Sequence, residues 1–378
     1  MARTIYFVAG EASGDEHGAA LMRSLVELNV DLNFVGRGGP QMKTIAGGNF
    51  ANWIDAAAIV GLWEVIKHYG YFRKQFRETL IEIDRNKPAA VVLIDYPGFN
   101  LRLARALRRR FPALKIIYYI SPQVWAWNRG RIPRMAEWLD LMLCIFPFEA
   151  ELYNESGLRT LFVGHPMIEN LRVDKIDDQR EENLVGIFPG SRRREVRKIL
   201  PIMLQAAREL LQDRSELYFE ISAASKSLAI EIESIFVAAG LPEKKFLILT
   251  GDAPDIMQRA YAGMVASGTA TLEAAAFRMP FILVYKVSWP TYFAARLVVK
   301  VKYLGMPNVL AEKEIVPEFI QGRARPDAIA EATSRLLNDD PARQLMISQF
   351  DAIVAKLGES GASKRAAEAI VKELTQAK

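Results

Sequence analysis

Short apolar runs alternate with longer amphipathic stretches along most of the chain. Most of the runs are too short for a buried helix and end in turn-forming residues, which is typical of strands buried on both faces of a parallel sheet. The stretches between them fit helices, and from Asp327 onward the pattern is helical. This alternation predicts an α/β protein with doubly wound sheets. Strands are predicted over residues 4–9, 32–36, 89–94, 115–120, 141–145, 160–163, 184–188, 217–221, 246–249, 263–266 and 280–285.

The chain has 378 residues, which exceeds what one ordinary core holds, so about two domains are expected. Residues 169–183 are polar, mixed in charge and without apolar periodicity, and are interpreted as the linker. The prediction is therefore an N-terminal domain over 1–168 and a second domain over 184–345. Helices over 346–378 are expected to pack back on the first domain or on a partner.

The turn after the strand at 184–188 is dense in arginine. Pro189 and Gly190 end the strand, and Ser191 is placed to cap the helix that follows. The first N–H groups of a helix and its positive dipole end form an anion site, and arginine binds phosphate in a two-pronged fashion. The turn therefore indicates a diphosphate cradle, with a solvated basic helix face as the alternative. Its arginines are Arg192, Arg193, Arg194 and Arg197.

A second turn of this kind follows the strand at 263–266. Gly268 allows a close backbone approach, and Thr269 is placed to cap a helix. Glu273 lies one turn into that helix, where a carboxylate can accept both hydroxyls of a ribose. The alternative is that Glu273 only complements the helix dipole.

Two turns in the N-terminal half carry carboxylates. The first strand ends in Gly10-Glu11-Ala12-Ser13-Gly14-Asp15, and the strand at 89–94 ends in Asp95. Ligands of open α/β sheets bind outside the carboxyl ends of strands, so both turns are candidate sites. The glycines at 10, 14 and 18 do not match G-x-G-x-x-G, so no dinucleotide site is predicted. Asn100 is predicted to cap the next helix.

The 49 basic and 44 acidic residues give a net charge of +5, and the cations are clustered. Such clusters suit nucleotides, phosphorylated lipids or anionic membrane surfaces. No nucleic-acid-binding signature occurs, so no nucleic acid partner is predicted. The first cluster comprises Arg102, Arg105, Arg108, Arg109 and Arg110, and the second comprises Arg296, Lys300 and Lys302.

Other features favour a cytoplasmic protein. The single cysteine, Cys144, excludes an internal disulfide, no secretory signal precedes the first strand, and no apolar run approaches the ~20 residues that cross a bilayer. Residues 56–76 interleave aromatic and basic side chains, which suits a membrane interface or lipid pocket, although an ordinary packed helix is the commoner case. The tryptophans of residues 121–129 are expected to hold an amphiphile or to pack in the core.

Eight motifs, in this order, resemble those of the lipid-A-disaccharide synthases, which are glycosyltransferases of the GT-B type. The resemblance extends over about residues 5–325. It implies two Rossmann-like domains facing a central cleft. The motifs are VAGEASGD (8–15), IDYPGFN (94–100), SPQVWAW (121–127), FPFE (146–149), FVGHP (162–166), PGSRRREV (189–196), ASGTATLE (266–273) and MPNVLA (306–311).

The resemblance implies an inverting transfer of the 2,3-diacylglucosamine unit of a UDP-activated donor. The acceptor is the 6-hydroxyl of 2,3-diacylglucosamine 1-phosphate, and the products are a β-1,6 disaccharide and UDP. No cofactor is implied. A metal is not expected, because the sequence has no Asp-x-Asp pair and its three histidines are widely separated. A peripheral protein on the cytoplasmic face of the inner membrane is expected, and a homo-oligomer is left open.

Site residues are carried over on the same motifs. Asp95 is the expected general base, with Glu11 and Asp15 as competitors for taking or positioning the proton. The expected UDP and diphosphate contacts are Gly190, Ser191, Arg192, Arg193, Ser267, Gly268, Thr269, Glu273 and Asn308, and Gln321 lies near the C-terminal motifs. The expected acceptor or lipid contacts are Ser13, Gly14, Trp63, Tyr69, Gln123, Trp125, Trp127 and Arg129.

One position departs from the family pattern, and two rival functions remain. The family commonly has a second aspartate where this chain has Gly98. That second carboxylate therefore has no role here, which strengthens the prediction that Asp95 is the general base. The rival enzymes are a UDP-sugar 2-epimerase and a glycosyltransferase with a water-soluble acceptor. The non-enzymatic rival is a nucleotide-sensing binding protein.

Overall fold

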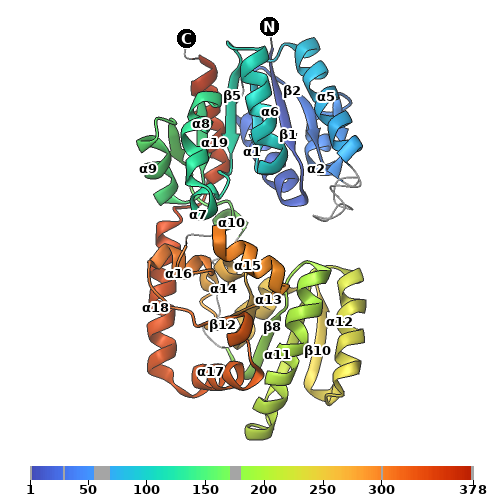
Figure 1. Cartoon of the computed structure of the whole chain (residues 1–378), viewed down its shortest axis with the longest axis vertical. Helices are drawn as coiled ribbons and strands as arrows, with labels where there is room; N and C mark the ends of the chain where they lie inside the picture. Colours follow the sequence, from blue (N-terminus) through green and yellow to red (C-terminus); the bar gives the residue numbers. More distant parts are fainter. Residues whose placement is uncertain (1, 29, 55–68, 171–179, 299–300, 376–378) are drawn as a thin grey trace. The chain divides into compact units, whose positions relative to one another are not determined.

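A computed structural model describes residues 2–28, 30–54, 69–170, 180–298 and 301–375. The chain divides into two compact units, each with its own sheet (Figure 1). Unit 1 comprises Met1–Asn170 and Leu357–Lys378, and unit 2 comprises Leu171–Lys356.

The described part of unit 1 contains a seven-stranded sheet in the order β3-β2-β1-β4-β5-β6-β7, with every neighbouring pair parallel. Its central strands are apolar runs buried on both faces, as parallel sheets require. The strands are β1 (Arg3–Ala9), β2 (Leu32–Gly38), β3 (Phe50–Asn52), β4 (Ala90–Ile94), β5 (Lys115–Tyr119), β6 (Leu141–Cys144) and β7 (Thr160–Phe162).

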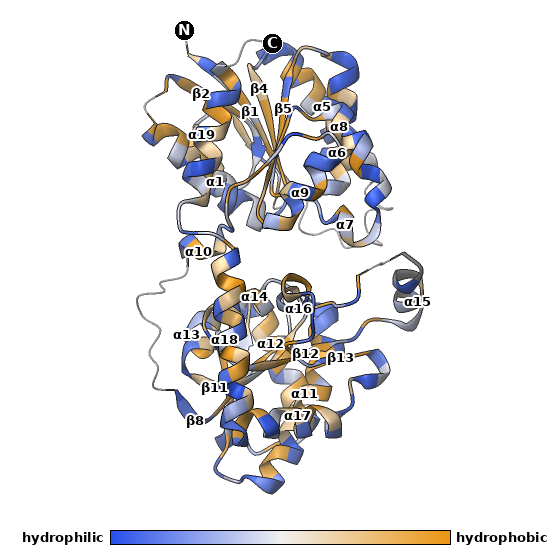
Figure 2. Cartoon of the chain, turned by 90° about the vertical axis from the view of Figure 1, so that its left-hand side faces the viewer, coloured by the Kyte–Doolittle hydropathy of each residue, from blue (hydrophilic) through white to orange (hydrophobic). Residues whose placement is uncertain are grey.

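Helices cover both faces of this sheet. Figure 2 shows α1 and α19 on one face and α5, α6 and α8 on the other, in agreement with the packing of α1 on α19 and of α6 on α5 and α8. The helices are α1 (Ala12–Glu27), α2 (Pro40–Ala46), α5 (Tyr69–Asn86), α6 (Pro97–Arg110), α7 (Val124–Trp127), α8 (Ile132–Trp138), α9 (Pro147–Glu155), α10 (Met167–Asn170) and α19 (Ala362–Thr375), with a 3₁₀ turn at Arg129–Arg131.

The described part of unit 2 repeats this plan with a six-stranded parallel sheet in the order β10-β9-β8-β11-β12-β13. The strands are β8 (Glu181–Phe188), β9 (Tyr218–Ala223), β10 (Phe246–Thr250), β11 (Ala260–Ala266), β12 (Phe281–Tyr285) and β13 (Glu318–Ile320). Its helices are α11 (Arg193–Asp213), α12 (Lys226–Ala239), α13 (Ala253–Arg259), α14 (Ala270–Ala276), α15 (Trp289–Val298), α16 (Met306–Ala311), α17 (Pro326–Asn338) and α18 (Asp340–Lys356), with 3₁₀ turns at Glu243–Lys245 and Gln321–Arg323.

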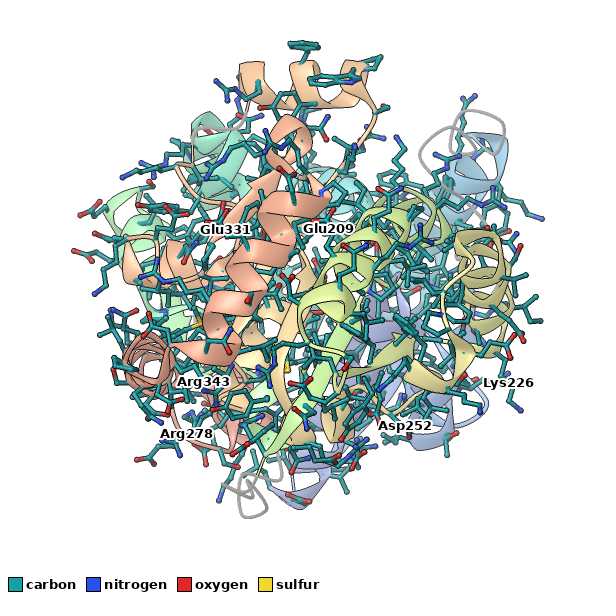
Figure 3. The ribbon with its side chains drawn as sticks, turned by 90° about the horizontal axis from the view of Figure 1, so that it is seen from below. Glu209, Lys226, Asp252, Arg278, Glu331 and Arg343 are labelled. Atoms are coloured by element: carbon teal, nitrogen blue, oxygen red, sulfur yellow. The ribbon has the colours of Figure 1, made fainter. Side chains whose placement is uncertain are left out.

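The last two helices belong to different units, so the division differs from the predicted boundary at 345, which falls inside α18. The guanidinium carbon of Arg343 on α18 lies 3.5 Å from the ring centroid of Tyr261, and Arg278 forms an ion pair with Asp351 at 3.2 Å, which fastens α18 to unit 2 (Figure 3 labels both arginines). By contrast, α19 packs on α1, and its Glu373 accepts a hydrogen bond of 2.7 Å from Lys115 in unit 1.

The predicted strands are all present, although their ends shift by a few residues. Strand β8 begins at Glu181, inside the segment predicted to be a linker, and residues 171–179 of that segment lie outside the described residues. The prediction missed β3 and β13, which have three residues each and no apolar run. In the part of the chain that the structure describes, no helix combines the length and apolar character needed to cross a bilayer.

Candidate functional site

Each sheet reverses its strand order at one point, and the predicted site residues follow the strands that flank it. In unit 1 the reversal lies between β1 and β4, whose last paired residues are Ala9 and Ile94. In unit 2 it lies between β8 and β11, where Phe188 pairs with Val265. The crevice outside the carboxyl ends at such a switch point is where α/β sheets bind ligands.

The backbone at Asp95 is strained. Asp95 and Tyr96 both have positive φ, 44° and 48°, which is uncommon for residues with a side chain and clusters at functional sites. Hydrogen bonds hold this conformation, because the Asp95 carbonyl accepts from the Asn100 amide at 2.8 Å and from the Tyr118 hydroxyl at 2.5 Å. Asn100 therefore fixes the end of β4 and does not cap α6, whose N-cap is Tyr96.

The carboxyl group of Asp95 has an unusual pKa. Burial and, to a smaller degree, the negative charge of Glu11 together raise the pKa to about 6, against a lowering by a backbone hydrogen bond from Tyr96. Glu11 is exposed and is the N-cap residue of α1. Gly10 is required beside this pair, since a Cβ there would lie 2.2 Å from the Tyr96 ring. A carboxylate with a pKa near neutrality is suited to accept a proton.

Asp15 has a different arrangement from its two competitors. It is buried, and its carboxylate accepts hydrogen bonds from the backbone N–H groups of Gly39, Gln41 and Met42 at 2.9–3.0 Å. These N–H groups lie at the start of α2, where the N-cap residue, Gly39, has no side chain that could accept their hydrogen bonds. The geometry therefore fits Asp15 to the structural task of holding α2, and it leaves Asp95 and Glu11 as the candidates for taking the proton.

The tryptophan loop after β5 is anchored by Glu149, the last residue of the motif FPFE (146–149), which had no predicted role of its own. Buried Glu149 accepts hydrogen bonds from the Ser121 hydroxyl at 2.6 Å and the Trp125 indole at 2.8 Å. Burial raises the pKa of Glu149 to about 7. Trp125 is only 4% exposed and packs edge-on against Phe148, so its predicted lipid-facing role is wrong because its indole N–H is drawn inward by Glu149.

The other predicted acceptor contacts differ in their exposure to solvent. Ser13, Gln123 and Arg129 are exposed, and Trp127 is 38% exposed with the Arg131 guanidinium 4.8 Å from its ring. Gly14 is buried under the start of α1, where a Cβ would touch Ala9. Tyr69 is the first residue of α5, and Trp63 lies outside the described residues, as does most of the aromatic stretch that contains it.

In unit 2 the turn after β8 approaches the turn after β11 closely. Gly190 has a φ of 108°, and a Cβ on it would lie 2.9 Å from the Glu195 carboxylate and 3.7 Å from Ala266. The helix begins at Arg193 with Arg192 as its N-cap, so the predicted capping by Ser191 is wrong, because the chain stays extended for one residue more. Ser191 and Arg192 are exposed at the amino end of the 21-residue helix α11, whose first N–H groups lack partners within the helix.

The arginines of this turn are arranged by carboxylates. Arg193 and Arg197 both form ion pairs with Glu231 of α12, at 3.0 and 2.5 Å, and Arg192 forms one with Glu195 at 3.2 Å. The pairs hold the guanidinium groups at the amino end of α11 while leaving them solvent-exposed. An incoming diphosphate can therefore meet two arginines and the helix terminus together.

The turn after β11 is open. Gly268 has a φ of 153°, and no atom lies within 4 Å of where its Cβ would be. Gly268 and Thr269 are exposed, Ser267 is partly so, and Glu273 lies in the first turn of α14. Thr269 is the N-cap residue of α14, although its side chain makes no capping hydrogen bond.

Asn308 does not face this turn. Its side chain is fully buried: the amide nitrogen donates to Val316 and Glu318, and the oxygen accepts from the backbone of Ile315 and Val316, all at 2.8–2.9 Å. All four hydrogen-bonding positions are thus used inside the protein. The predicted contact of Asn308 with UDP is therefore wrong, and its role is to hold α16 to the segment before β13. Gln321 is likewise buried and bonds the backbone of Val287.

Among the described residues, no three His, Cys, Asp or Glu side chains form a cluster that could hold a metal ion. The charged groups that the two switch points offer to a ligand include the carboxylates of Asp95 and Glu11 in unit 1 and the guanidinium groups of Arg192 and Arg193 in unit 2. The first group can take a proton, and the second can bind an anion.

Solved structures share the fold. S. aureus MnaA in complex with UDP has a TM-score of 0.67 and 13% identity, and the match covers 99% of this chain and 97% of the other. CalG4, the calicheamicin glycosyltransferase, has a TM-score of 0.61 and 16% identity, with 99% of each chain covered. These similarities show two doubly wound α/β units of the GT-B type.

Sequence comparison is more specific. The lipid-A-disaccharide synthase of Geobacter sulfurreducens is 37% identical over 381 residues, which cover 98% of this chain and 97% of the relative. The sequence profile described as lipid-A-disaccharide synthetase matches residues 5–372. The chain therefore belongs to the lipid-A-disaccharide synthetase family, the enzymes of lipid A disaccharide synthesis.

Proposed function

We propose that this chain transfers the sugar of UDP-2,3-diacylglucosamine to the 6-hydroxyl of 2,3-diacylglucosamine 1-phosphate, with inversion. The products are the β-1,6 disaccharide 1-phosphate and UDP. The family match over residues 5–372 is the observation that carries the proposal. The two switch points supply the residue roles, one acting on the hydroxyl and the other on the diphosphate.

The acceptor oxygen attacks the anomeric carbon while the bond from that carbon to the diphosphate oxygen breaks. The hydroxyl proton passes to the Asp95 carboxylate, which is the best placed base because its pKa of about 6 leaves it ionised at neutral pH. Burial and the charge of Glu11 keep this pKa raised, and Glu11 helps to orient the acceptor. Asp15 keeps α2 in place.

The departing diphosphate carries away the electron pair of the broken bond. Arg192, Arg193 and the N–H groups that begin α11 stabilise its charge, and the open backbone at Gly268 and Thr269 completes the cradle. Glu273 accepts the ribose hydroxyls of the donor. No step in this scheme assigns a task to a metal ion, so turnover is expected to continue in the presence of EDTA.

Acylated substrates reside in a membrane, and α15 offers a surface for it. Trp289 and Phe293 are 54% and 60% exposed, with ring centroids 5.7 Å apart, and Tyr292 lies on the same helix face. Figure 2 shows α15 standing away from the sheet of unit 2. No acidic residue occurs between Glu273 and Glu312, whereas Arg296 and other cations do. Aromatic rings flanked by cations suit an anionic lipid interface, so we place the enzyme on the cytoplasmic face of the inner membrane.

The test is incubation of the purified protein with both acylated substrates, with and without EDTA, followed by detection of the disaccharide and UDP. Disaccharide formation in both conditions is expected, and loss of turnover with the chelator contradicts the scheme without a metal.

For the membrane surface, Trp289→Ser with Phe293→Ser should reduce binding to anionic vesicles. Ile230→Ser with Val237→Ser, two exposed apolar residues of α12, is the matched control.

A further inference from the structure

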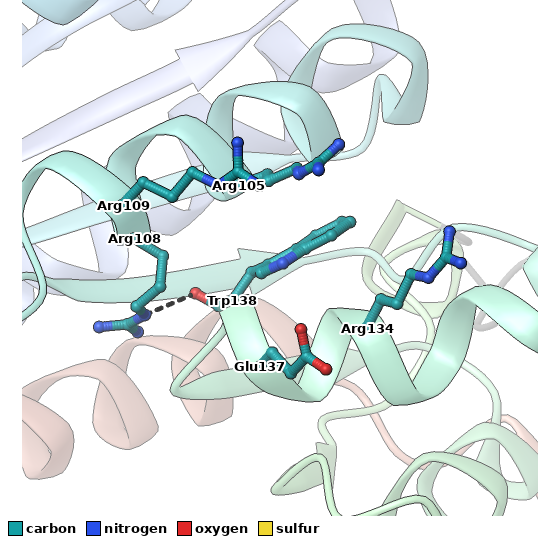
Figure 4. A pocket seen from close by; sticks show the side chains of 6 residues that line it. All are labelled: Arg105, Arg108, Arg109, Arg134, Glu137 and Trp138. Atoms are coloured by element: carbon teal, nitrogen blue, oxygen red, sulfur yellow. Dashed lines mark hydrogen bonds between the residues drawn. The ribbon is translucent and has the colours of Figure 1, made fainter.

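An arginine-lined groove lies between α6 and α8 of unit 1, and none of the roles above uses it. It has a volume of about 530 Å³ and is formed by the outer faces of the two helices (Figure 4). A second hollow of about 520 Å³ continues along α6 and shares Arg105 and Arg109 with the first. The first hollow is lined by Arg105, Arg108, Arg109, Arg134, Glu137 and Trp138.

Two of the six arginines around the two hollows are held by protein groups. Arg108 pairs with Asp140 at 2.5 Å and donates to the carbonyls of Pro112, Leu114 and Trp138, and Arg110 pairs with Asp84 at 2.6 Å. These bonds make Arg108 part of the groove wall.

The other four arginines have no carboxylate partner within the described part of the chain. They are Arg102, Arg105, Arg109 and Arg134, and the single acidic residue lining the hollows is Glu137. Helix α6 contains no acidic residue at all. Like charges gathered on one helix face repel one another, so the arrangement costs stability unless an anion occupies it.

One of the four is already positioned. The guanidinium carbon of Arg105 lies 5.9 Å from the centroid of the Trp138 ring, and Figure 4 shows Arg105 and Arg109 above that ring, with Arg134 beyond it on α8. The indole restrains the guanidinium and shields one side from water. Holding an arginine in place reduces the entropy lost when it binds a ligand.

We propose that this groove binds the phosphate group of an anionic ligand. A phosphate presents three charged oxygens, enough for two-pronged bonds to two guanidinium groups, such as those of Arg105 and Arg109. The groove lies apart from the switch point of unit 1, because Arg109 follows Pro97 at the start of α6 by twelve residues, or roughly 18 Å of helix. It is therefore a second anion site, separate from the one proposed for the donor diphosphate.

The experiment uses the full chain and two probes that represent the two sources of phosphate. Inorganic pyrophosphate, titrated by calorimetry, represents a soluble ligand. Vesicles of phosphatidylcholine, alone or mixed with phosphatidylglycerol, represent a lipid headgroup. The groove variant is Arg105→Ala with Arg109→Ala, and Lys244→Ala with Arg335→Ala removes the same charge from exposed positions of unit 2. Arg192→Ala with Arg193→Ala reports on the donor site independently.

The groove variant should weaken at least one probe about tenfold or more, because two charge-assisted contacts are lost, while the unit 2 control does not. Weakening for pyrophosphate identifies a soluble source, and weakening for the mixed vesicles identifies a lipid headgroup. The proposal is overturned if the groove variant binds both probes as the parent does, or if it weakens them no more than the control. Arg192→Ala with Arg193→Ala should leave the groove-dependent binding intact, whether or not it weakens binding at the proposed donor site.

Discussion

The two switch points occupy the same place in two similar units, yet the groups that they offer to a ligand differ in charge. In unit 1 the edge carries the carboxylates of Glu11 and Asp95, and Asp95 is largely buried and lies on strained backbone with a φ of 44°. In unit 2 the edge carries glycines, exposed arginines and the amino end of a long helix. Burial and a like charge raise a carboxyl pKa and favour proton transfer, whereas open backbone and cations favour anion binding. One fold, used twice, thus separates acid–base work from phosphate binding.

The largest expected effect comes from removing the base. Asp95→Asn keeps the shape and the backbone hydrogen bonds but cannot accept a proton. We expect the turnover number for disaccharide formation to fall about a hundredfold to ten-thousandfold, with UDP binding unchanged. Glu11→Gln is the matched variant and should cost far less. Equal losses in the two variants would show that the carboxylates act as a pair, and a fully active Asp95→Asn would move the base elsewhere.

The comparison also explains what could be predicted from the sequence. Most strands of the two sheets were predictable because they are apolar runs, and the turns at their ends then had to gather at one edge. The three-residue strands β3 and β13 carry no such run. The local pattern also predicted Ser191 as the helix cap, whereas the extended backbone at Arg192 makes Arg192 the N-cap residue.

The roles of individual polar residues were harder to predict, because their partners are distant in sequence. Asp15 binds amides 24 to 27 residues away, and Trp125 bonds a glutamate 24 residues away. Asn308 lies in the motif MPNVLA (306–311), but its side-chain oxygen accepts hydrogen bonds from backbone N–H groups seven and eight residues on. A turn shows which residues gather at an edge, but not which of them face inward.

The next largest effect concerns the diphosphate side. Gly190→Ala forces a side chain into a φ of 108° beside Glu195, and strain of about 1–3 kcal/mol should displace the turn. UDP affinity, measured by calorimetry, is expected to fall about tenfold. Gly240→Ala is the control, since Gly240 also has positive φ but ends α12 with no atom near its Cβ. It should lower the melting temperature without changing UDP affinity. A Gly190→Ala variant that binds UDP normally would remove this turn from the donor site.

The pH dependence isolates the carboxylate side. If Asp95 must be ionised, kcat/KM should fall about tenfold per unit as the pH drops below about 6. Protonation of Asp95 favours the folded state, because its pKa is higher there than in the unfolded chain, so this loss is not unfolding caused by that group. Glu11→Gln should shift the limb to lower pH, since the charge of Glu11 raises the pKa of Asp95. An unshifted limb would mean that the two carboxylates do not interact.

The smallest expected effect tests the one position where the carboxylate edge is simpler than the family pattern. Gly98 lies in the first turn of α6, and no atom lies within 4 Å of where its Cβ would be, so Gly98→Asp fits without rearrangement. Aspartate replaces a flexible glycine and complements the helix dipole, which should stabilise unit 1 by about 0.5–1 kcal/mol. A new negative charge in the turn that follows Asp95 should also move the acidic limb of kcat/KM to higher pH. Gly98→Asn adds the same bulk without the charge and should leave the limb in place. If both variants shift it equally, the backbone of the Asp95 turn, and not the charge around it, sets the pKa of the base.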